Sequence, residues 1–244
     1  MRLRIQIATK VRQIPWAAVL APGRALAYEW IERSDRDLAV VLHRNGLPPH
    51  GMVPFGHGAP VFPGAKRVAG SYAAAATGYV EFGSPVPNIV ESFAKALANA
   101  PVLDWGGAAF HVEKVNVVPT PEFEFGAASM RTATPLVLKG SGRDASGSRT
   151  TRQAWLFPGD DEYVPYLTQN LRRKAATLGL APDVEVTGVT WAGPQRSFYV
   201  KNGHKPGAPV EVSLRGSPEI LRAVHSWGLG QGTSAGFGWV RHNV

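Results

Sequence analysis

The chain contains no cysteine. Disulfide bonds, cysteine nucleophiles and thiolate metal sites are therefore excluded. The chain also lacks an unbroken apolar run of about 18 residues, the length that a helix needs to span a bilayer. Its first residues alternate between polar and apolar types, so they do not form the apolar core of a signal peptide. We expect a cytoplasmic protein that does not bind membranes.

Several motifs of common catalytic sites are missing as well. The chain has neither the phosphate-binding pattern GxxxxGKS/T nor a GxGxxG pattern between a strand and a helix. Its seven histidines include no HExxH pair and no spacing typical of metal ligands. The acidic run at residues 160–162 fits the start of a helix better than a cation site. We expect no cofactor and no metal ion.

Positively charged side chains are in excess. Lys and Arg number 26 against 18 Asp and Glu, which gives a formal net charge of +8. This excess favours an anionic partner, with a nucleic acid ahead of a membrane surface.

Glycine is concentrated near the end of the chain. Five of the eleven residues from Gly228 to Gly238 are glycine, and the apolar residues Phe237 and Trp239 flank the last of them. Glycine allows positive φ angles and a close approach of the backbone to another molecule. We expect this glycine-rich loop to lie between a helix and a short final strand at residues 237–242, and to face either a phosphate-bearing partner or the sheet formed by the first half of the chain.

The first half of the chain predicts one mixed unit. Residues 2–9 alternate, with Leu3, Ile5 and Ile7 on one face and Arg2 and Arg4 on the other, as in a half-buried strand. Ser34 is expected to cap a second helix directly after the first. The expected order of strand, helix, strand, strand, helix and strand is ferredoxin-like. The elements are strands at 2–9, 52–55, 71–82 and 109–118, and helices at 22–33, 35–43 and 87–99.

The second half repeats this order after the Pro119-Thr-Pro121 segment, a plausible linker. We therefore predict an α+β fold of two tandem ferredoxin-like (RRM-like) units, residues 1–120 and 121–244, each an antiparallel sheet with helices on one face. The expected elements are strands at 129–139, 152–157, 184–200, 210–214 and 237–242, and helices at 160–178 and from Pro218, the latter capped by Ser217.

His43 and Tyr28 are the candidates for chemistry. His43 ends the second short helix, and Tyr28 lies fifteen positions earlier on the first. Two antiparallel helices joined near Ser34 would bring the two side chains within reach of each other. A histidine at such a position is more often a solvated side chain without chemistry, so spacing alone does not make this an active site.

Together these residues resemble the CRISPR-associated endoribonuclease family that cuts precursor repeat RNA, a tandem ferredoxin-like family of the RAMP type. The sequence Ser234-x-Gly-Phe-Gly238 resembles its glycine-rich signature. The segment ending at His43 resembles the one that carries its histidine, and Tyr28 matches the position of its tyrosine. Phe55, and the segments 87–98 and 112–117, fit the rest of the pattern, so the resemblance covers nearly the whole chain.

The resemblance implies cleavage without a metal ion. The 2′-hydroxyl of the RNA attacks the adjacent phosphate and leaves a 2′,3′-cyclic phosphate and a 5′-hydroxyl. His43 would be the general acid or base, Tyr28 would orient the 2′-hydroxyl or act as the base, and Arg44 would stabilise the phosphorane. Several members of the family have a lysine shortly after the histidine. Residues 47–53 here contain none, so either His50 or Arg44 replaces it or the third role is absent.

CRISPR repeat RNA, as a stem-loop or an unstructured repeat, is the expected partner, along with other subunits of a CRISPR effector complex. A basic hairpin around the Asn202-Gly203 turn would track the RNA, although a solvated hairpin is equally compatible with the sequence. Two alternative functions remain, a non-catalytic RNA-binding subunit of an effector complex and a general RRM protein that stacks single strands. The expected RNA-binding residues are Arg196, Lys201, Lys205, Gly230, Gly232, Ser234 and Gly236.

Overall fold

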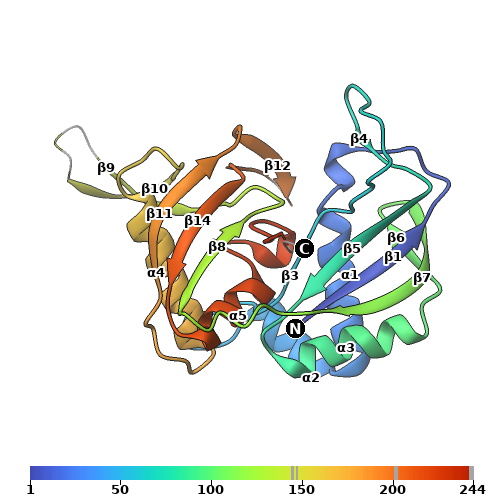
Figure 1. Ribbon diagram of the computed structural model, residues 1–244, viewed down its shortest axis with the longest axis horizontal. Helices are drawn as coiled ribbons and strands as arrows, with labels where there is room; N and C mark the ends of the chain where they lie inside the picture. Colours follow the sequence, from blue (N-terminus) through green and yellow to red (C-terminus); the bar gives the residue numbers. More distant parts are fainter. Residues whose placement is uncertain (144–145, 147, 201–202, 242–244) are drawn as a thin grey trace.

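The computed structural model describes residues 1–143, 146, 148–200 and 203–241. Two antiparallel sheets stand side by side, one from each half of the chain (Figure 1). No helix in the residues so described is long and apolar enough to cross a bilayer.

The first sheet has the strand order β3-β5-β1-β7-β6, and every neighbouring pair is antiparallel. Leu3, Ile5 and Ile7 of β1 are buried, as their alternation predicts, and they share one core with Trp30 and Phe93 of the helices that cover this face. β6 is an additional edge strand that the sequence did not predict. The elements are β1 (Arg2–Ala8), β2 (Gln13–Ile14), a 3-10 helix η1 (Trp16–Ala18), α1 (Ala21–Ser34), α2 (Arg36–Arg44), β3 (Gly56–His57), β4 (Tyr72–Ala73), β5 (Thr77–Gly83), α3 (Pro87–Ala98), β6 (Val102–Trp105) and β7 (Ala108–Val118).

The second sheet has the order β11-β14-β8, and a second core of buried side chains lies against it. At the free side of β8, Val240 forms a bridge with Thr132, in the place where a ferredoxin-like unit has its fourth strand. The elements are β8 (Ala127–Arg131), β9 (Lys139–Arg143), β10 (Arg149–Trp155), α4 (Tyr163–Thr177), β11 (Glu185–Ala192), β12 (Arg196–Val200), β13 (Gly203–Gly207), β14 (Val210–Arg215), α5 (Pro218–Trp227) and a 3-10 helix η2 (Thr233–Ala235).

Several expected strands differ in the structure. The strand predicted at 52–55 appears as β3 at Gly56–His57, and the one predicted at 184–200 is two strands, β11 and β12, in separate sheets. The strand predicted at 71–82 is two strands, β4 and β5, because β4 pairs with β2 and β5 pairs with β1. The strand predicted at 129–139 ends at Arg131, shortly before Pro135, which has no backbone N–H to give to a ladder. Within residues 237–241 the expected final strand is only the bridge at Val240, because Gly238 has a φ of +61° and turns the chain.

The cap of α2 also differs from the expectation. Asp35, rather than Ser34, precedes the helix, and its carboxylate accepts a hydrogen bond of 2.9 Å from the backbone N–H of Leu38. Helix α1 extends through Ser34, so that residue is already helical. Because the two helices are separated by a single extended residue, α2 turns back along α1.

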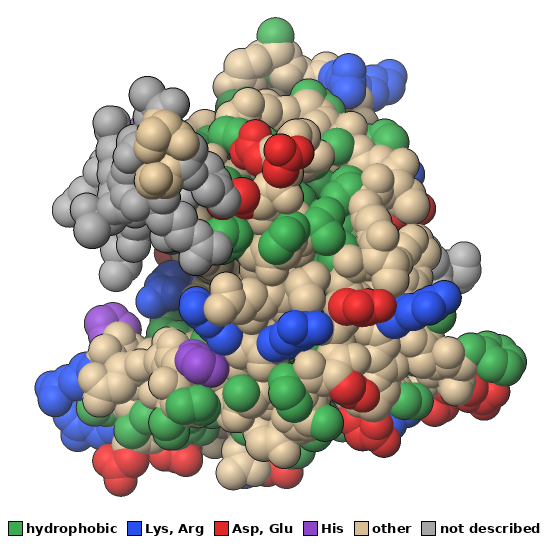
Figure 2. Space-filling model, turned by 90° about the vertical axis from the view of Figure 1, so that its left-hand side faces the viewer, with side chains coloured by type: hydrophobic (Ala, Val, Ile, Leu, Met, Phe, Trp, Pro, Cys, Tyr) green, Lys and Arg blue, Asp and Glu red, His purple; other side chains and the backbone are tan. Residues whose placement is uncertain are grey.

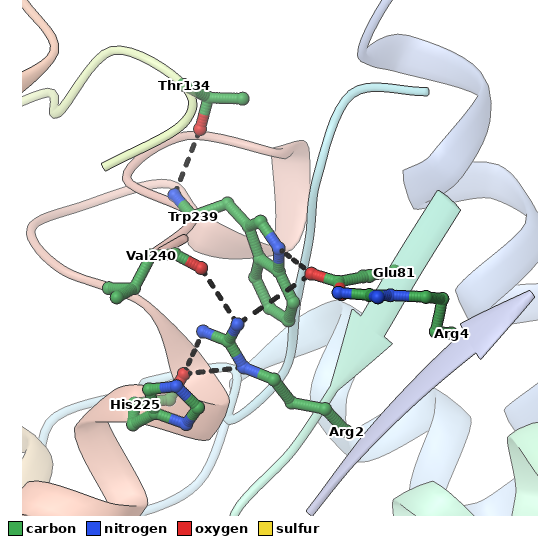
Figure 3. Close-up of polar contacts among 7 residues, drawn as sticks. All are labelled: Arg2, Arg4, Glu81, Thr134, His225, Trp239 and Val240. Carbon is green, nitrogen blue, oxygen red and sulfur yellow. Dashed lines mark hydrogen bonds and ion pairs between the residues drawn. The ribbon is translucent and has the colours of Figure 1, made fainter. Parts of the chain in front are cut away.

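The two halves are joined through Arg2, whose side chain is fully buried although its alternation in β1 placed it on an outer face. Its guanidinium donates to the carbonyl of His225 at 2.9 Å and to that of Val240 at 2.8 Å (Figure 3). It also lies 4.1 Å from the ring centre of Trp239 and 3.8 Å from the carboxylate of Glu81. Burial lowers the pKa of Arg2 to about 9, and the charge of Glu81 acts in the opposite direction. These contacts offset the burial of the charge and fix the C-terminal segment against the first sheet.

Candidate active site

Helices α1 and α2 bring Tyr28 and His43 together. Their ring centres are 5.4 Å apart, with the rings at 74° to each other. Tyr28 is half-buried and also packs edge-on against Phe55, whereas His43 is exposed in the last turn of α2. The pair is therefore a histidine open to solvent beside a tyrosine held in the protein.

The hydroxyl of Tyr28 has two polar neighbours. It donates to the carbonyl of Leu42 at 3.3 Å and accepts from Nη2 of Arg24 at 3.4 Å. Burial raises the pKa of Tyr28, while the charge and hydrogen bond of Arg24 act in the opposite direction. At neutral pH the phenol keeps its proton, so this side chain serves as a hydrogen-bond donor rather than as a base.

Arg44 and His50, the sequence-based candidates for a third role, are both exposed. Neither forms a hydrogen bond, ion pair or ring contact within the part of the chain that the structure describes. The structure therefore shows no contact of either residue with the Tyr28–His43 pair, and a catalytic role for Arg44 stays a prediction.

Arg24 is the side chain that the sequence did not single out. Its guanidinium carbon lies 4.7 Å from the ring centre of Tyr28, and its Nη1 donates to Oγ of Ser234 at 2.7 Å. A spacing of four residues places Arg24 and Tyr28 on one face of α1, so their proximity could have been predicted from the sequence. The contact of Arg24 with Ser234, 210 positions away, could not have been predicted from it. Arg24 thus links the glycine-rich loop to the candidate pair.

The glycine-rich loop is packed into the protein. Ala235 and Phe237 belong to the core of the first half, although they lie near the end of the chain. A Cβ at Gly236, whose φ is +87°, would stand 2.7 Å from the ring of His57, and one at Gly230 would stand 2.8 Å from Leu136. Both glycines are buried, so packing alone requires them there. That Gly230, Gly232, Ser234 and Gly236 bind RNA stays a prediction, and Gly232 is the one that is partly exposed.

The predicted basic hairpin is present as β12 and β13, which pair antiparallel. Arg196 is exposed, with its guanidinium carbon 6.0 Å from the ring centre of Trp16, and Phe198 packs edge-on against Phe237 of the loop at 6.2 Å. Nζ of Lys205 lies 3.8 Å from where a Cβ of Gly232 would stand. Lys201, also predicted to bind RNA, is outside the described residues. The hairpin therefore reaches the same loop that Arg24 contacts.

A cleft of about 610 Å³ lies where the two halves meet. Arg4, Tyr79 and Glu81 line it from the first sheet, and Trp239 and Arg241 from the C-terminal segment. Arg4 stacks over Tyr79 at 4.5 Å and pairs with Glu81 at 2.8 Å. Figure 3 shows Glu81 between Arg4 and the indole N–H of Trp239, which donates to it at 3.0 Å. Cations and aromatic rings thus line one cavity.

Basic residues are spread over the surface seen in Figure 2. On that face, Lys and Arg side chains lie in several separate groups among acidic and hydrophobic ones, and they do not merge into one patch. Net charge therefore does not locate the binding site. In the described residues, no three or more His, Asp or Glu side chains lie together as ligands for a metal ion.

The comparison with known families follows this geometry. A family model described as CRISPR associated protein Cas6, C-terminal, matches residues 118–242. The chain belongs to the Cas6 family. The family resemblance inferred from the glycine-rich loop is confirmed. Comparison with curated proteins gave no match.

Solved structures show the same fold in Cas6-type proteins. The product of a Cas6-related gene from Pyrococcus furiosus has a TM-score of 0.81 at 15% identity, over 99% of this chain and 97% of that one. A RAMP protein that binds different RNA substrates has a TM-score of 0.80 at 17% identity, over 99% and 98%. A CRISPR associated protein Cas6 has a TM-score of 0.77 at 20% identity, over 100% and 99%. This likeness to the Cas6 and RAMP fold confirms the predicted tandem ferredoxin-like class.

Proposed function

We propose that this chain is an endoribonuclease that cuts precursor CRISPR RNA within its repeats, without a metal ion. The observation that carries the proposal is the Tyr28–His43 pair. Helices α1 and α2 hold its rings 5.4 Å apart in a chain of the Cas6 family, beside the family's glycine-rich loop. The contact could not follow from composition or charge, because it depends on how two helices pack.

The chemistry is an internal transfer at phosphorus. A bond forms between the 2′-oxygen and phosphorus while the bond from phosphorus to the 5′-oxygen breaks, giving a 2′,3′-cyclic phosphate and a 5′-hydroxyl. The 2′-hydroxyl loses a proton and the 5′-oxygen gains one. His43, exposed next to Tyr28, takes one of these proton transfers, and such positioned catalysis contributes roughly 10²–10⁴-fold. Tyr28, which keeps its proton, would turn its hydroxyl from the carbonyl of Leu42 to the RNA and donate the hydrogen bond that orients the reacting group.

RNA binding would use two surfaces, the basic hairpin and the cleft between the halves. Arg196 and Lys205 of the hairpin supply phosphate contacts, and Lys205 adjoins the partly exposed Gly232. In the cleft between the halves, Arg4 and Arg241 would contact phosphates while Tyr79 offers a ring on which a base can stack. CRISPR repeat RNA is the proposed partner, and other effector-complex subunits are further candidates.

We keep the proposed unit boundary at residues 120 and 121. Two features support it: the family model begins at residue 118, and the buried side chains form one core per half. The loop residues Ala235 and Phe237 cross this boundary, since they pack in the first core.

A second candidate function is a Cas6-type subunit that holds RNA without cutting it. The observation that favours it is that few contacts hold the side chain of His43 in place. Its side chain forms no hydrogen bond with the described residues, and residues 47–53 contain no lysine. In the catalytic proposal the RNA itself orients His43, whereas in the binding proposal His43 is an ordinary surface residue.

One experiment separates the two functions. The pure protein is incubated in EDTA with repeat RNA from its own CRISPR locus, and with the same RNA carrying a 2′-deoxy nucleotide at the cut position. The proposed nuclease cuts only the unmodified RNA and leaves a cyclic phosphate. Binding of both RNAs without cleavage of either would establish the non-catalytic function instead.

A further inference from the structure

Among the described arginines that are partly or fully buried, Arg24 differs from the others in forming no ion pair with a described carboxylate. Arg2 and Arg4 share Glu81, and Arg131 pairs with Glu211. Within the described part of the chain, Arg24 forms no ion pair with a carboxylate. Its only polar partners there are two hydroxyl groups, those of Ser234 and Tyr28. A partly buried positive charge without a counter-ion is unfavourable, and an anionic ligand would offset it.

The geometry leaves Arg24 able to bind such a ligand. Nη1 donates one hydrogen bond to Ser234 and Nη2 donates one to Tyr28, whereas a guanidinium has five N–H donors. The planar group stacks over the Tyr28 ring at 4.7 Å, and His43 packs against the same ring. The remaining donors match the paired oxygens of a phosphate, which arginine binds in bidentate fashion.

We infer that Arg24 binds the phosphate at which the RNA is cut, and that Ser234 holds its side chain in place. The inference rests on the proposed function, because it assigns the anion as the RNA phosphate next to Tyr28 and His43. Arg24 then supplies the positive charge that stabilises the phosphorane, in a chain without a lysine at residues 47–53. Arg44, exposed and unattached to the pair, is not needed for this role.

The contact between Arg24 and Ser234 also assigns a role to the glycine-rich loop. Ser234 is buried in the loop, as the central residue of η2, and its hydroxyl accepts the shorter of the two hydrogen bonds of Arg24, 2.7 Å against 3.4 Å. The loop therefore sets the position of a cation on α1 from a place 210 residues away in the chain. Ser234 acts through Arg24 and is a positioning residue.

Four variants test these roles in cleavage: Arg24→Gln, Arg24→Lys, Ser234→Ala and, as the matched control, Arg33→Gln at the exposed end of the same helix. Single-turnover cleavage is measured at saturating RNA, together with Kd and the melting temperature. We expect Arg24→Gln to lower the rate about 100-fold, in the range seen when one transition-state donor is removed. Arg24→Lys should recover part of the rate, Ser234→Ala should lose roughly tenfold, and Arg33→Gln should match the wild type. A wild-type rate for Arg24→Gln would overturn the inference while leaving the proposed nuclease intact.

A second measurement does not depend on cleavage. Repeat RNAs with 2′-deoxy nucleotides, which cannot be cut by this chemistry, each carry one neutral methylphosphonate, moved along the repeat one linkage at a time. If Arg24 binds a phosphate, the wild type loses about tenfold in affinity at one linkage, and Arg24→Gln loses almost nothing there. Arg33→Gln should behave as the wild type. The inference is wrong if no linkage distinguishes Arg24→Gln from the wild type.

The two proposals fail separately. If the wild type does not cut RNA but the methylphosphonate effect depends on Arg24, the protein is a binding subunit whose Arg24 contacts a phosphate. If the wild type cuts and neither measurement depends on Arg24, the nuclease stands and the role of Arg24 is refuted.

Discussion

Tyr28 and His43 could be placed together from the sequence because both depend on short-range features. Each lies on a helix with readable apolar spacing, and one residue between the helices makes them turn back on each other. Arg2 and Arg24 could not be placed this way. The partners of Arg2 at residues 225 and 240, and that of Arg24 at residue 234, are more than 200 positions away. Alternation in a strand predicts that Arg2 faces outward, and only the second half of the chain reverses this.

His57 carries a pH dependence of stability. It is fully buried, with Nδ1 3.1 Å from the carbonyl oxygen of Gly58, and burial lowers its pKa from 6.5 to about 4. Its Nε2 has no partner in the described chain. Because the unfolded state takes up a proton below pH 6.5 and the folded state does so only near pH 4, acidification between these values favours unfolding. We expect a loss of about 3 kcal/mol from pH 7.5 to pH 4 through this residue.

Urea unfolding at both pH values measures this contribution. His57→Asn should reduce the difference between the free energies of unfolding at pH 7.5 and pH 4 by about 3 kcal/mol, whatever its effect on stability at pH 7.5. His50→Asn, at an exposed histidine, is the matched control and should leave the difference unchanged. If His57→Asn and the wild type lost the same stability on acidification, His57 would not be the buried neutral group described.

The glycine-rich loop was correctly predicted as an element, and two environments were expected for it, RNA or the sheet of the first unit. Five glycines in eleven residues indicate tight turns, and the structure packs the loop against the first half of the chain. In the structure the nearest partner is the protein itself, since Gly236 adjoins His57 and Gly238 adjoins Leu229. A glycine pattern indicates where other atoms lie close to the backbone. It does not indicate whether those atoms belong to RNA or to the protein itself. The final strand was missed for a related reason, because Gly238 turns the chain where Phe237 and Trp239 suggested an extended one.

Gly236→Val should therefore impair folding more than chemistry. The new side chain would meet His57 and Leu20 at a φ of +87°, and such overpacking with backbone strain costs about 2–4 kcal/mol. Thermal melting should show a clear decrease, and RNA affinity should fall with the folded fraction. The matched control is Gly188→Val on β11, where a Cβ would meet nothing within 4 Å. A normal melting temperature with a loss of cleavage rate alone would contradict the packing role.

At the scale of the whole molecule, the sequence predicted the two ferredoxin-like units. It did not predict how the two units contact each other. Order and periodicity of the elements are local properties, so the tandem ferredoxin-like class followed from them, while β6 and the split of residues 71–82 depended on strand pairing. The cleft at the junction holds Arg4, Tyr79 and Trp239, which belong to separate parts of the chain. The cleft exists because the two halves pack together through contacts such as those of Arg2. No short segment of the sequence therefore predicts it.

RNA affinity should depend strongly on salt because the proposed contacts are with phosphates. We expect Kd to rise at least about tenfold between 50 and 200 mM salt, since counterions are released on binding. Arg196→Ala, at an exposed hairpin position, should reduce the slope of log Kd against log salt by about 1. Arg33→Ala, on the exposed end of α1 and paired with Glu29, is the control and should keep the slope. Affinity that is flat across this range would refute the phosphate contacts.

The central claim is that His43 performs proton transfer in cleavage of repeat RNA. Its most direct test is the single-turnover rate of His43→Ala in EDTA, with Kd for the repeat measured beside it and His111→Ala, at an exposed histidine of β7, as the matched control. We predict that His43→Ala loses at least about 100-fold in rate while its Kd stays within about threefold of the wild type, and that His111→Ala is unaffected. Cleavage by His43→Ala at the wild-type rate would contradict the account.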